Sequence, residues 1–196
     1  MFRDIPQSVE VTQGHLKALE AWRAAQGMEP HRLLPQVTKE TGKLLALLLA
    51  SCPAGDAVEL GTGAGYSALW LALACRASGR KLITFERDPA KAELARHCLG
   101  AAEVLDVVEL READGFEGLK TIPNPAFCFI DAEREQTREA YELALAALSP
   151  GGLIVVDCVI SHADAFTHFL LDVEVDPRVD MVVVPNGTGL LLCRKV

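Results

Sequence analysis

Short apolar, β-branched runs alternate along the chain with longer stretches in which apolar residues recur at helical spacing. The short runs predict buried strands, and the longer stretches predict helices packed against them. Strands are expected at residues 57–60, 81–86, 107–110, 127–130 and 153–156. Helices are expected at residues 66–75, 89–99, 141–148 and 163–171. This repeated alternation predicts an α/β fold with a Rossmann-like, doubly wound sheet.

The N-terminal part of the chain has a purely helical pattern. Val11, His15, Ala18 and Trp22 recur at helical spacing and form one stripe, and Thr38 is a suitable N-cap for a second helix that reaches residue 50. A polar, proline-bearing stretch separates the two patterns. We therefore expect an N-terminal helical appendage over residues 1–35 and a main domain over residues 36–196.

The C-terminal part of the chain predicts a hairpin. Two apolar runs, 179–184 and 190–193, flank the turn-forming residues 185–189, which include two glycines and a proline. A hairpin at this point closes the sheet with an antiparallel strand.

Composition narrows the classes of function. The 196 residues are half apolar, and 19 Lys and Arg stand against 27 Asp and Glu, for a net charge of −8. This balance argues against nucleic acid as a partner, because such proteins need a basic face. No apolar run is long enough to span a membrane or to serve as a secretory signal. The six cysteines lie at least 23 positions apart, without metal-ligand spacing, which favours reduced thiols and a cytoplasmic location.

Glycines and carboxylates follow the expected strands, where ligands bind in sheets of this kind. The first strand ends in a loop with glycines at 61, 63 and 65, and the second ends in Glu86, placed to hold a ribose. Later strands end in Asp114, Asp131 and Asp157. Taken by themselves, the glycines could also belong to a tight turn that binds no ligand. The five strand ends together favour a nucleoside site.

The spacing of the glycines separates two kinds of nucleoside ligand. A nicotinamide-dependent oxidoreductase needs G-x-G-x-x-G, whereas Tyr66 stands where the last glycine of that motif belongs. Glu59, two residues before Gly61, would repel a pyrophosphate and attract an ammonium group. An adenosyl amino acid satisfies both conditions.

Four segments, at residues 59–67, 129–134, 148–157 and 185–195, resemble bacterial O-methyltransferases related to the caffeoyl-CoA and catechol enzymes. The resemblance covers roughly residues 31–196. It implies a class I S-adenosylmethionine-dependent methyltransferase with a seven-stranded sheet, mostly parallel, whose last strand is antiparallel. It also suggests a homodimer.

The resemblance assigns a cofactor position to individual residues. Glu86 would bind the ribose, Asp114 and Gly115 the adenine, and Asp131 would lie near the sulfonium. The methionine part and its glycine loop would involve Val37, Glu59, Gly61, Thr62, Gly63 and Ser67.

The chain departs from the family pattern on the side of the methyl acceptor. The family binds a divalent metal at positions that here hold Asp131, Asp157 and Cys158, the last in place of an asparagine. A thiol favours no metal, or a softer metal than magnesium, so the two aspartates are weak candidates for a metal site. Arg134 replaces the family's lysine, and Thr137 replaces a tyrosine.

These observations favour methyl transfer from S-adenosylmethionine to a hydroxyl oxygen of a small molecule. Without magnesium, a side chain must take the acceptor proton, and Asp157 and His162 are the candidates. Arg134, beside Asp131, would orient the acceptor oxygen or stabilise its anion. A non-catalytic protein that binds S-adenosylmethionine or S-adenosylhomocysteine is the main alternative, and the nicotinamide-dependent oxidoreductase is a weaker one.

Overall fold

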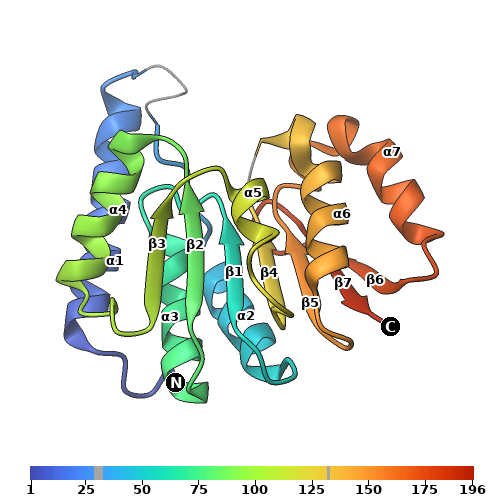
Figure 1. Ribbon diagram of the computed structural model, residues 1–196. Coiled ribbons are helices and arrows are strands. Elements are labelled where there is room, and N and C mark those ends of the chain that lie inside the picture. The colour runs from blue at the N-terminus through green and yellow to red at the C-terminus, as the bar shows by residue number, and fades with distance from the viewer. Residues whose placement is uncertain (29–32, 132) are drawn as a thin grey trace.

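A seven-stranded sheet in the order β3-β2-β1-β4-β5-β7-β6 forms the centre of the structure, a computed structural model that describes residues 1–28, 33–131 and 133–196 (Figure 1). Strands β1 to β5 are parallel, and β7 runs antiparallel to both β5 and β6. The strands are β1 Ala57–Leu60, β2 Leu82–Glu86, β3 Val108–Glu112, β4 Phe127–Ile130, β5 Leu153–Val156, β6 Val179–Val184 and β7 Leu190–Lys195. The predicted fold class is confirmed.

Helices cover both faces of the sheet and bury two separate apolar clusters (Figure 1). One face carries α1 Gln7–Ala25, α2 Lys39–Ser51, α3 Tyr66–Ser78 and α4 Pro89–Ala101. The other carries α5 Gly115–Leu119, α6 Thr137–Ala147 and α7 Ala163–Glu174, with a 3-10 turn, η2 Arg134–Gln136, before α6. Because strand side chains alternate in direction, Ala57 faces the first cluster and Val58 the second.

Most of the expected elements agree with the structure to within a few residues at their ends. β3 begins one residue later than expected and extends to Glu112, and the short helix α5 was not expected. Five residues are too few for a periodic pattern, and α5 forms because Asp114 caps its first turn.

Helix α1 forms as expected, but the stripe predicted for it lies on the solvent side. Val11 and Trp22 are 63% and 54% exposed, whereas Val9 and Leu16 are fully buried. The buried face also carries Thr12, which satisfies its hydroxyl by donating to the Ser8 carbonyl and so tolerates burial. The face of α1 that packs against α3 and α4 therefore carries both apolar and polar residues, and the predicted stripe faces solvent.

The division at residue 35 stays a prediction, and residues 29–32 beside it lie outside the part of the chain that the structure describes. Val9 and Leu16 of α1 belong to the same apolar cluster as α2 and α3. In the described residues, no helix is long and apolar enough to cross a membrane.

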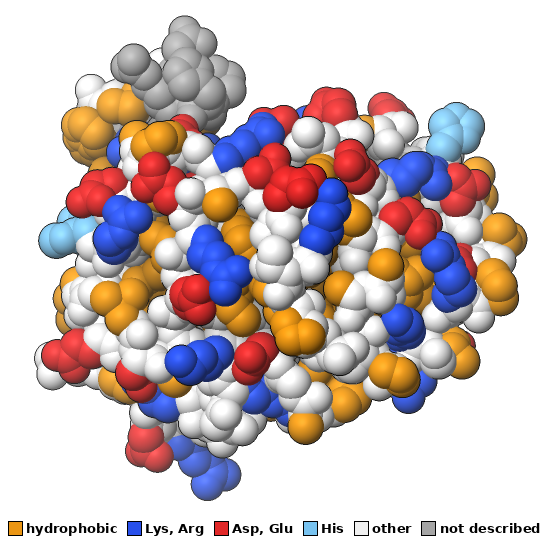
Figure 2. Space-filling model, viewed as in Figure 1, with side chains coloured by type: hydrophobic (Ala, Val, Ile, Leu, Met, Phe, Trp, Pro, Cys, Tyr) orange, Lys and Arg blue, Asp and Glu red, His pale blue; other side chains and the backbone are white. Residues whose placement is uncertain are grey.

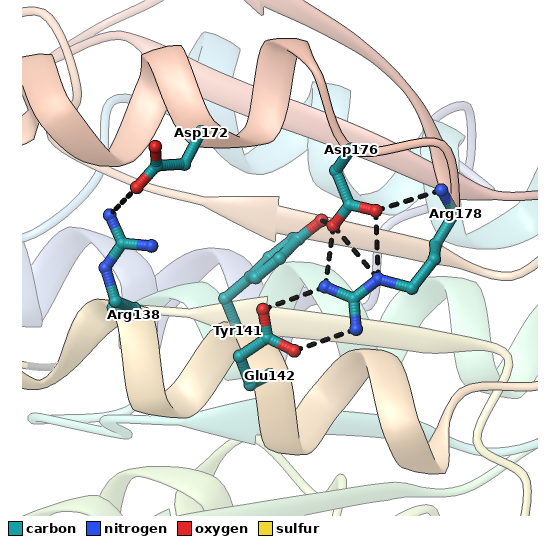
Figure 3. Close-up of polar contacts among 6 residues, drawn as sticks. All are labelled: Arg138, Tyr141, Glu142, Asp172, Asp176 and Arg178. Carbon is teal, nitrogen blue, oxygen red and sulfur yellow. Dashed lines mark hydrogen bonds and ion pairs between the residues drawn. The ribbon is translucent and has the colours of Figure 1, made fainter.

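Ion pairs connect α6 with α7 and the turn after it (Figure 3). Arg178 donates to both Glu142 oxygens, at 2.9 and 2.8 Å, and to the Asp176 carboxylate. Tyr141 donates its hydroxyl to the same Asp176 at 3.2 Å. Acidic and basic side chains are interspersed over the molecular face that Figure 2 shows.

Candidate active site

The sheet reverses its order between β1 and β4, where a crevice opens at the carboxyl ends of the strands. The loop after β1 has glycines with φ of 94° at Gly61, 54° at Gly63 and 95° at Gly65. These left-handed conformations suit glycine and strain other residues. The backbone N–H groups of Gly61 and Thr62 donate to the Phe85 carbonyl, which holds the loop against the end of β2.

Glu86 ends β2 and ties the glycine loop in place. Its Oε2 accepts from the Gly63 N–H at 2.9 Å, and its Oε1 accepts from the Asp88 N–H at 2.9 Å. The side chain also lines the cleft at the ends of the strands. The carboxylate is therefore fixed before any ligand binds, and its orientation costs little when a ligand hydroxyl reaches it.

Glu59, on β1, is fully buried. Its Oε2 accepts from the Thr84 hydroxyl at 2.5 Å, while its Oε1 has no partner among the described residues. Burial raises the pKa of Glu59 to about 7; the nearby hydroxyls of Ser67 and Thr84 oppose this shift, and the Glu86 carboxylate adds to it. A buried carboxyl oxygen without a partner is costly, so this site calls for a cationic donor.

The opposite wall of the cleft is formed by the start of α5. Asp114 caps this helix by accepting from the N–H groups of Phe116, at 2.7 Å, and Glu117, at 3.4 Å. A Cβ on Gly115 would lie 2.8 Å from Cδ2 of Leu60, so only glycine fits there without displacement. Both Asp114 and Gly115 line the cleft.

Asp131, Asp157 and Cys158 meet at the ends of β4 and β5. One possible ligand atom from each lies within 4.8 Å of the others. Burial and, to a smaller extent, the nearby carboxylates of Asp157 and Glu59 together raise the pKa of Asp131 to about 8. Asp157 is itself 6% exposed, and its Oδ1 accepts from the Cys158 N–H at 2.7 Å and the Thr188 hydroxyl at 2.6 Å.

The cleft has a volume of about 570 Å³. Arg134 enters it from η2, in the same cavity as Asp131, and its guanidinium has no ion-pair partner among the described residues. Arg87 and Glu133 form an ion pair and also line the cleft. The lining residues are Pro35, Leu60, Gly61, Phe85, Glu86, Arg87, Asp88, Lys91, Ala113, Asp114, Gly115, Phe116, Asp131, Glu133, Arg134, Glu135 and Gln136.

The structure places the residues singled out from the sequence in three groups. The first group lines the cleft and consists of Gly61, Glu86, Asp114, Gly115, Asp131 and Arg134. The second group does not line it and consists of Val37, Glu59, Thr62, Gly63, Ser67 and Asp157, most of them buried. The third is His162, which lies in a separate depression over residues 160–165, where its Nδ1 is 2.9 Å from the Ser161 hydroxyl. Ala132, within the motif at 129–134, lies outside the described residues.

Several residues of the site were not predicted from the sequence, among them two supporting threonines. Thr84 supports Glu59 because the parallel pairing of β1 and β2 sets the two residues side by side. Thr188 supports Asp157 from the turn between β6 and β7, 31 residues further along the chain. Lys91 and Phe116 also line the cleft without having been predicted. Threonines are common in strands and turns, so only the sheet register, for Thr84, and the position of the turn, for Thr188, reveal their roles.

A seven-stranded sheet with this order, a glycine loop after β1 and acidic residues at the strand ends define a methyltransferase-type α/β fold. The chain belongs to the O-methyltransferase family, whose model matches residues 10–196.

Individual relatives agree with this assignment. The catechol O-methyltransferase of Niastella koreensis is 37% identical over 129 residues, which are 63% of this chain and 58% of that protein. Caffeoyl-CoA O-methyltransferase 1 of Eucalyptus globulus is 26% identical over 80% of this chain and 73% of its own length. The O-methyltransferase of Bacillus cereus, solved in complex with SAH, shares the fold, with a TM-score of 0.76 at 24% identity over 95% of this chain and 91% of that one.

Proposed function

We propose that this protein transfers a methyl group from S-adenosylmethionine to a hydroxyl oxygen of a small molecule. The observation that carries the proposal is the pair of carboxylates on either side of the glycine loop. Glu59 has a buried oxygen without a partner, and Glu86 is held fixed at the mouth of the cleft. The first suits the ammonium group of an amino acid, and the second suits the hydroxyls of a ribose.

In this proposal the cofactor extends along the ends of β1, β2 and β3. Its adenine lies near Asp114 and Gly115, and its sulfonium points toward Asp131. The methionine part lies against the glycine loop and contacts Val37, Glu59, Gly61, Thr62, Gly63 and Ser67. Because most of these residues are buried, we expect the glycine loop to move when the methionine end binds.

The reaction needs the acceptor oxygen, the methyl carbon and the sulfur in line, and it needs a group that takes the acceptor proton. Asp131 and Asp157 are the carboxylates nearest to that position, and the raised pKa of Asp131 suits a proton acceptor near neutral pH. Arg134 stabilises the developing oxyanion. His162 lies outside the cleft, so this mechanism assigns it no step.

Magnesium does not fit the ligand set at the ends of β4 and β5. It prefers oxygen ligands in near-octahedral geometry, and Cys158 offers sulfur where the family has an amide oxygen. The proposed reaction therefore proceeds without a step through magnesium.

The acceptor in this proposal is a small hydroxylated molecule, since the relatives are named for catechol and caffeoyl-CoA. The homodimer implied by the resemblance is part of the proposal. The described cysteines are all free thiols, which supports a reducing compartment such as the cytoplasm.

Binding and turnover are tested separately. Calorimetric titration with S-adenosylmethionine and with NADH should show binding of the first alone, and binding of NADH instead would favour the oxidoreductase. Methyl transfer is then measured on a panel of catechols and related phenols.

Arg134 and Cys158 both differ from the family on the acceptor side. They favour a second candidate, a non-catalytic cofactor-binding protein, which binding without transfer to any acceptor would support.

A further inference from the structure

The acceptor side of the cleft has two carboxylates and one thiol as possible metal ligands. Asp131, Asp157 and Cys158 offer one atom each, all within 4.8 Å of one another. Bonds of about 2.0–2.3 Å from oxygen and sulfur to a zinc ion need only a modest contraction of this set. Mixed carboxylate and thiolate ligands suit borderline and soft divalent ions better than magnesium.

Hydrogen bonds already orient one of the carboxylates. Oδ1 of Asp157 accepts from both the Cys158 N–H and the Thr188 hydroxyl, and no hydrogen bond is given to its second oxygen by the described residues. Such outer contacts fix a ligand before the metal arrives and are typical of metal sites.

The thiol-bearing segment is also held in position. The N–H of Val159 donates to the Gly189 carbonyl, and the N–H groups of Ile160 and Ser161 donate to the Thr188 carbonyl. These bonds attach the segment after β5 to the turn between β6 and β7. Cys158, which precedes them, is half-buried beside the two carboxylates.

In the described part of the chain no basic side chain forms an ion pair with these three ligands, although the charge of Lys91 partly offsets that of Asp131. Arg134 lines the same cleft as Asp131, but in the described part of the chain the two side chains form no ion pair. Two carboxylates at short range in a partly buried site repel each other, and a divalent cation relieves that repulsion.

We propose that Asp131, Asp157 and Cys158 bind a thiophilic divalent cation, with zinc as the reference ion, at the ends of β4 and β5. Its role on the acceptor side rests on the proposed function, but its binding does not. When the cation is bound, Asp131 and Asp157 act as its ligands, and the role of proton acceptor given to them above applies to the metal-free protein. The ligands enter as two carboxylates and a thiolate, and the displaced protons pass to the buffer. Three protein ligands leave a coordination position for an oxygen of water or of the acceptor.

Cobalt(II) tests the proposal without any need for methyl transfer, because a cobalt–thiolate bond gives an intense near-ultraviolet charge-transfer band. The unmodified protein should show this band, zinc should abolish it, and a large excess of magnesium should leave it in place. Cys158→Ser should lose the band and bind zinc at least about tenfold more weakly by calorimetry. The control is Cys52→Ser, because Cys52 is also a half-buried thiol but lies at the end of α2, away from the site, and this variant should keep the band.

Three results would overturn the proposal: no cobalt or zinc binding to the unmodified protein, a band that persists in Cys158→Ser, or equal displacement by magnesium. Calorimetric titration of the same samples with S-adenosylmethionine keeps the two proposals apart. A protein that binds the cofactor but neither cobalt nor zinc refutes the metal site alone. A protein that binds zinc through Cys158 but never the cofactor refutes the proposed function alone.

Discussion

The hydroxyl of Thr84 donates a 2.5 Å hydrogen bond to Oε2 of Glu59 on the neighbouring strand. Since this hydroxyl is then committed as a donor, it accepts from Thr62, whose hydroxyl oxygen lies 2.5 Å away. The relay runs from the glycine loop through β2 to a buried carboxyl on β1. It holds one oxygen of Glu59 and leaves the other for a ligand.

Cofactor affinity should rise with pH through neutrality. The pKa of Glu59 is about 7 in the free protein, and an ammonium ligand favours the carboxylate, so binding lowers this pKa and releases protons. Affinity should therefore increase between about pH 6 and pH 8 and then level off. Calorimetry in buffers of different ionisation enthalpy measures the proton release.

Glu59→Gln should weaken binding of S-adenosylmethionine at pH 8 by at least about tenfold, because it removes a charge-assisted contact. It should also flatten the pH dependence, which separates Glu59 from Asp131, whose pKa is about 8. Thr84→Val is the matched variant: it keeps the carboxyl but removes its donor, so the rise in affinity should move to higher pH. Affinity that is independent of pH in the unmodified protein would contradict this assignment.

Glu86→Ala should weaken S-adenosylmethionine binding by at least about tenfold, because one charged hydrogen bond contributes roughly 1.5–3 kcal/mol. The variant also loses the two backbone contacts that hold the glycine loop. Glu112→Ala is the control, since Glu112 pairs in register with Glu86 on β3 but is exposed and does not line the cleft. Equal affinity of a folded Glu86→Ala protein and the unmodified protein would remove Glu86 from the site.

Methyl transfer should not depend on magnesium. Addition of magnesium should leave the rate unchanged, because one of the three possible ligands, Cys158, offers sulfur and magnesium prefers oxygen. Cys158→Asn should gain measurable magnesium affinity by calorimetry. The φ of 68° at this position is one that asparagine adopts readily, so the variant should fold. Loss of all activity in EDTA with recovery on magnesium addition would refute this prediction.

Stability should fall in acid partly through Asp176. Hydrogen bonds and the charge of Arg178 lower its pKa to about 2 from the ordinary 3.8, so its contribution is full above about pH 4 and is lost as pH falls toward 2. Asp176→Asn should lower the free energy of unfolding by about 1 kcal/mol at pH 6, after solvent screening, and by less near pH 2.

The control is Asp172→Asn, which removes an exposed pair with Arg138 and should lower the free energy of unfolding by less than about 0.5 kcal/mol (Figure 3). Chemical denaturation at several pH values measures both, and equal losses at pH 6 and pH 2 would exclude an ionic contribution of Asp176.

Substitution by alanine should have opposite effects on the free energy of unfolding at two helical glycines. A Cβ on Gly42, in α2, would overlap the Trp70 indole, so Gly42→Ala should destabilise the protein by about 1–3 kcal/mol. Gly14 in α1 is exposed, with nothing near its added Cβ, and Gly14→Ala should stabilise by about 0.4–1 kcal/mol. Thermal and urea unfolding check both, and a loss in Gly14→Ala as large as in Gly42→Ala would contradict the packing argument.

The sequence was sufficient for features encoded within a few residues. Strand β4 and strand β6 have the bounds expected from their apolar runs, and the glycines at 61, 63 and 65 have the left-handed backbone that a tight strand-to-helix turn requires. Alternation of the elements also determined the sheet class, because parallel neighbours need helical crossovers. These features depend on local periodicity and backbone sterics.

Only the tertiary structure decided which side chains meet. The partners of Glu59 and Asp157, Thr84 and Thr188, come from other elements, and the register of the sheet or the position of a turn brings them into contact. His162 comes only four residues after Cys158 in the chain, yet it lines another depression, because α7 begins there. The buried face of α1 likewise follows from the surface that α3 and α4 offer. Such relationships join residues far apart in sequence, and no local pattern records them.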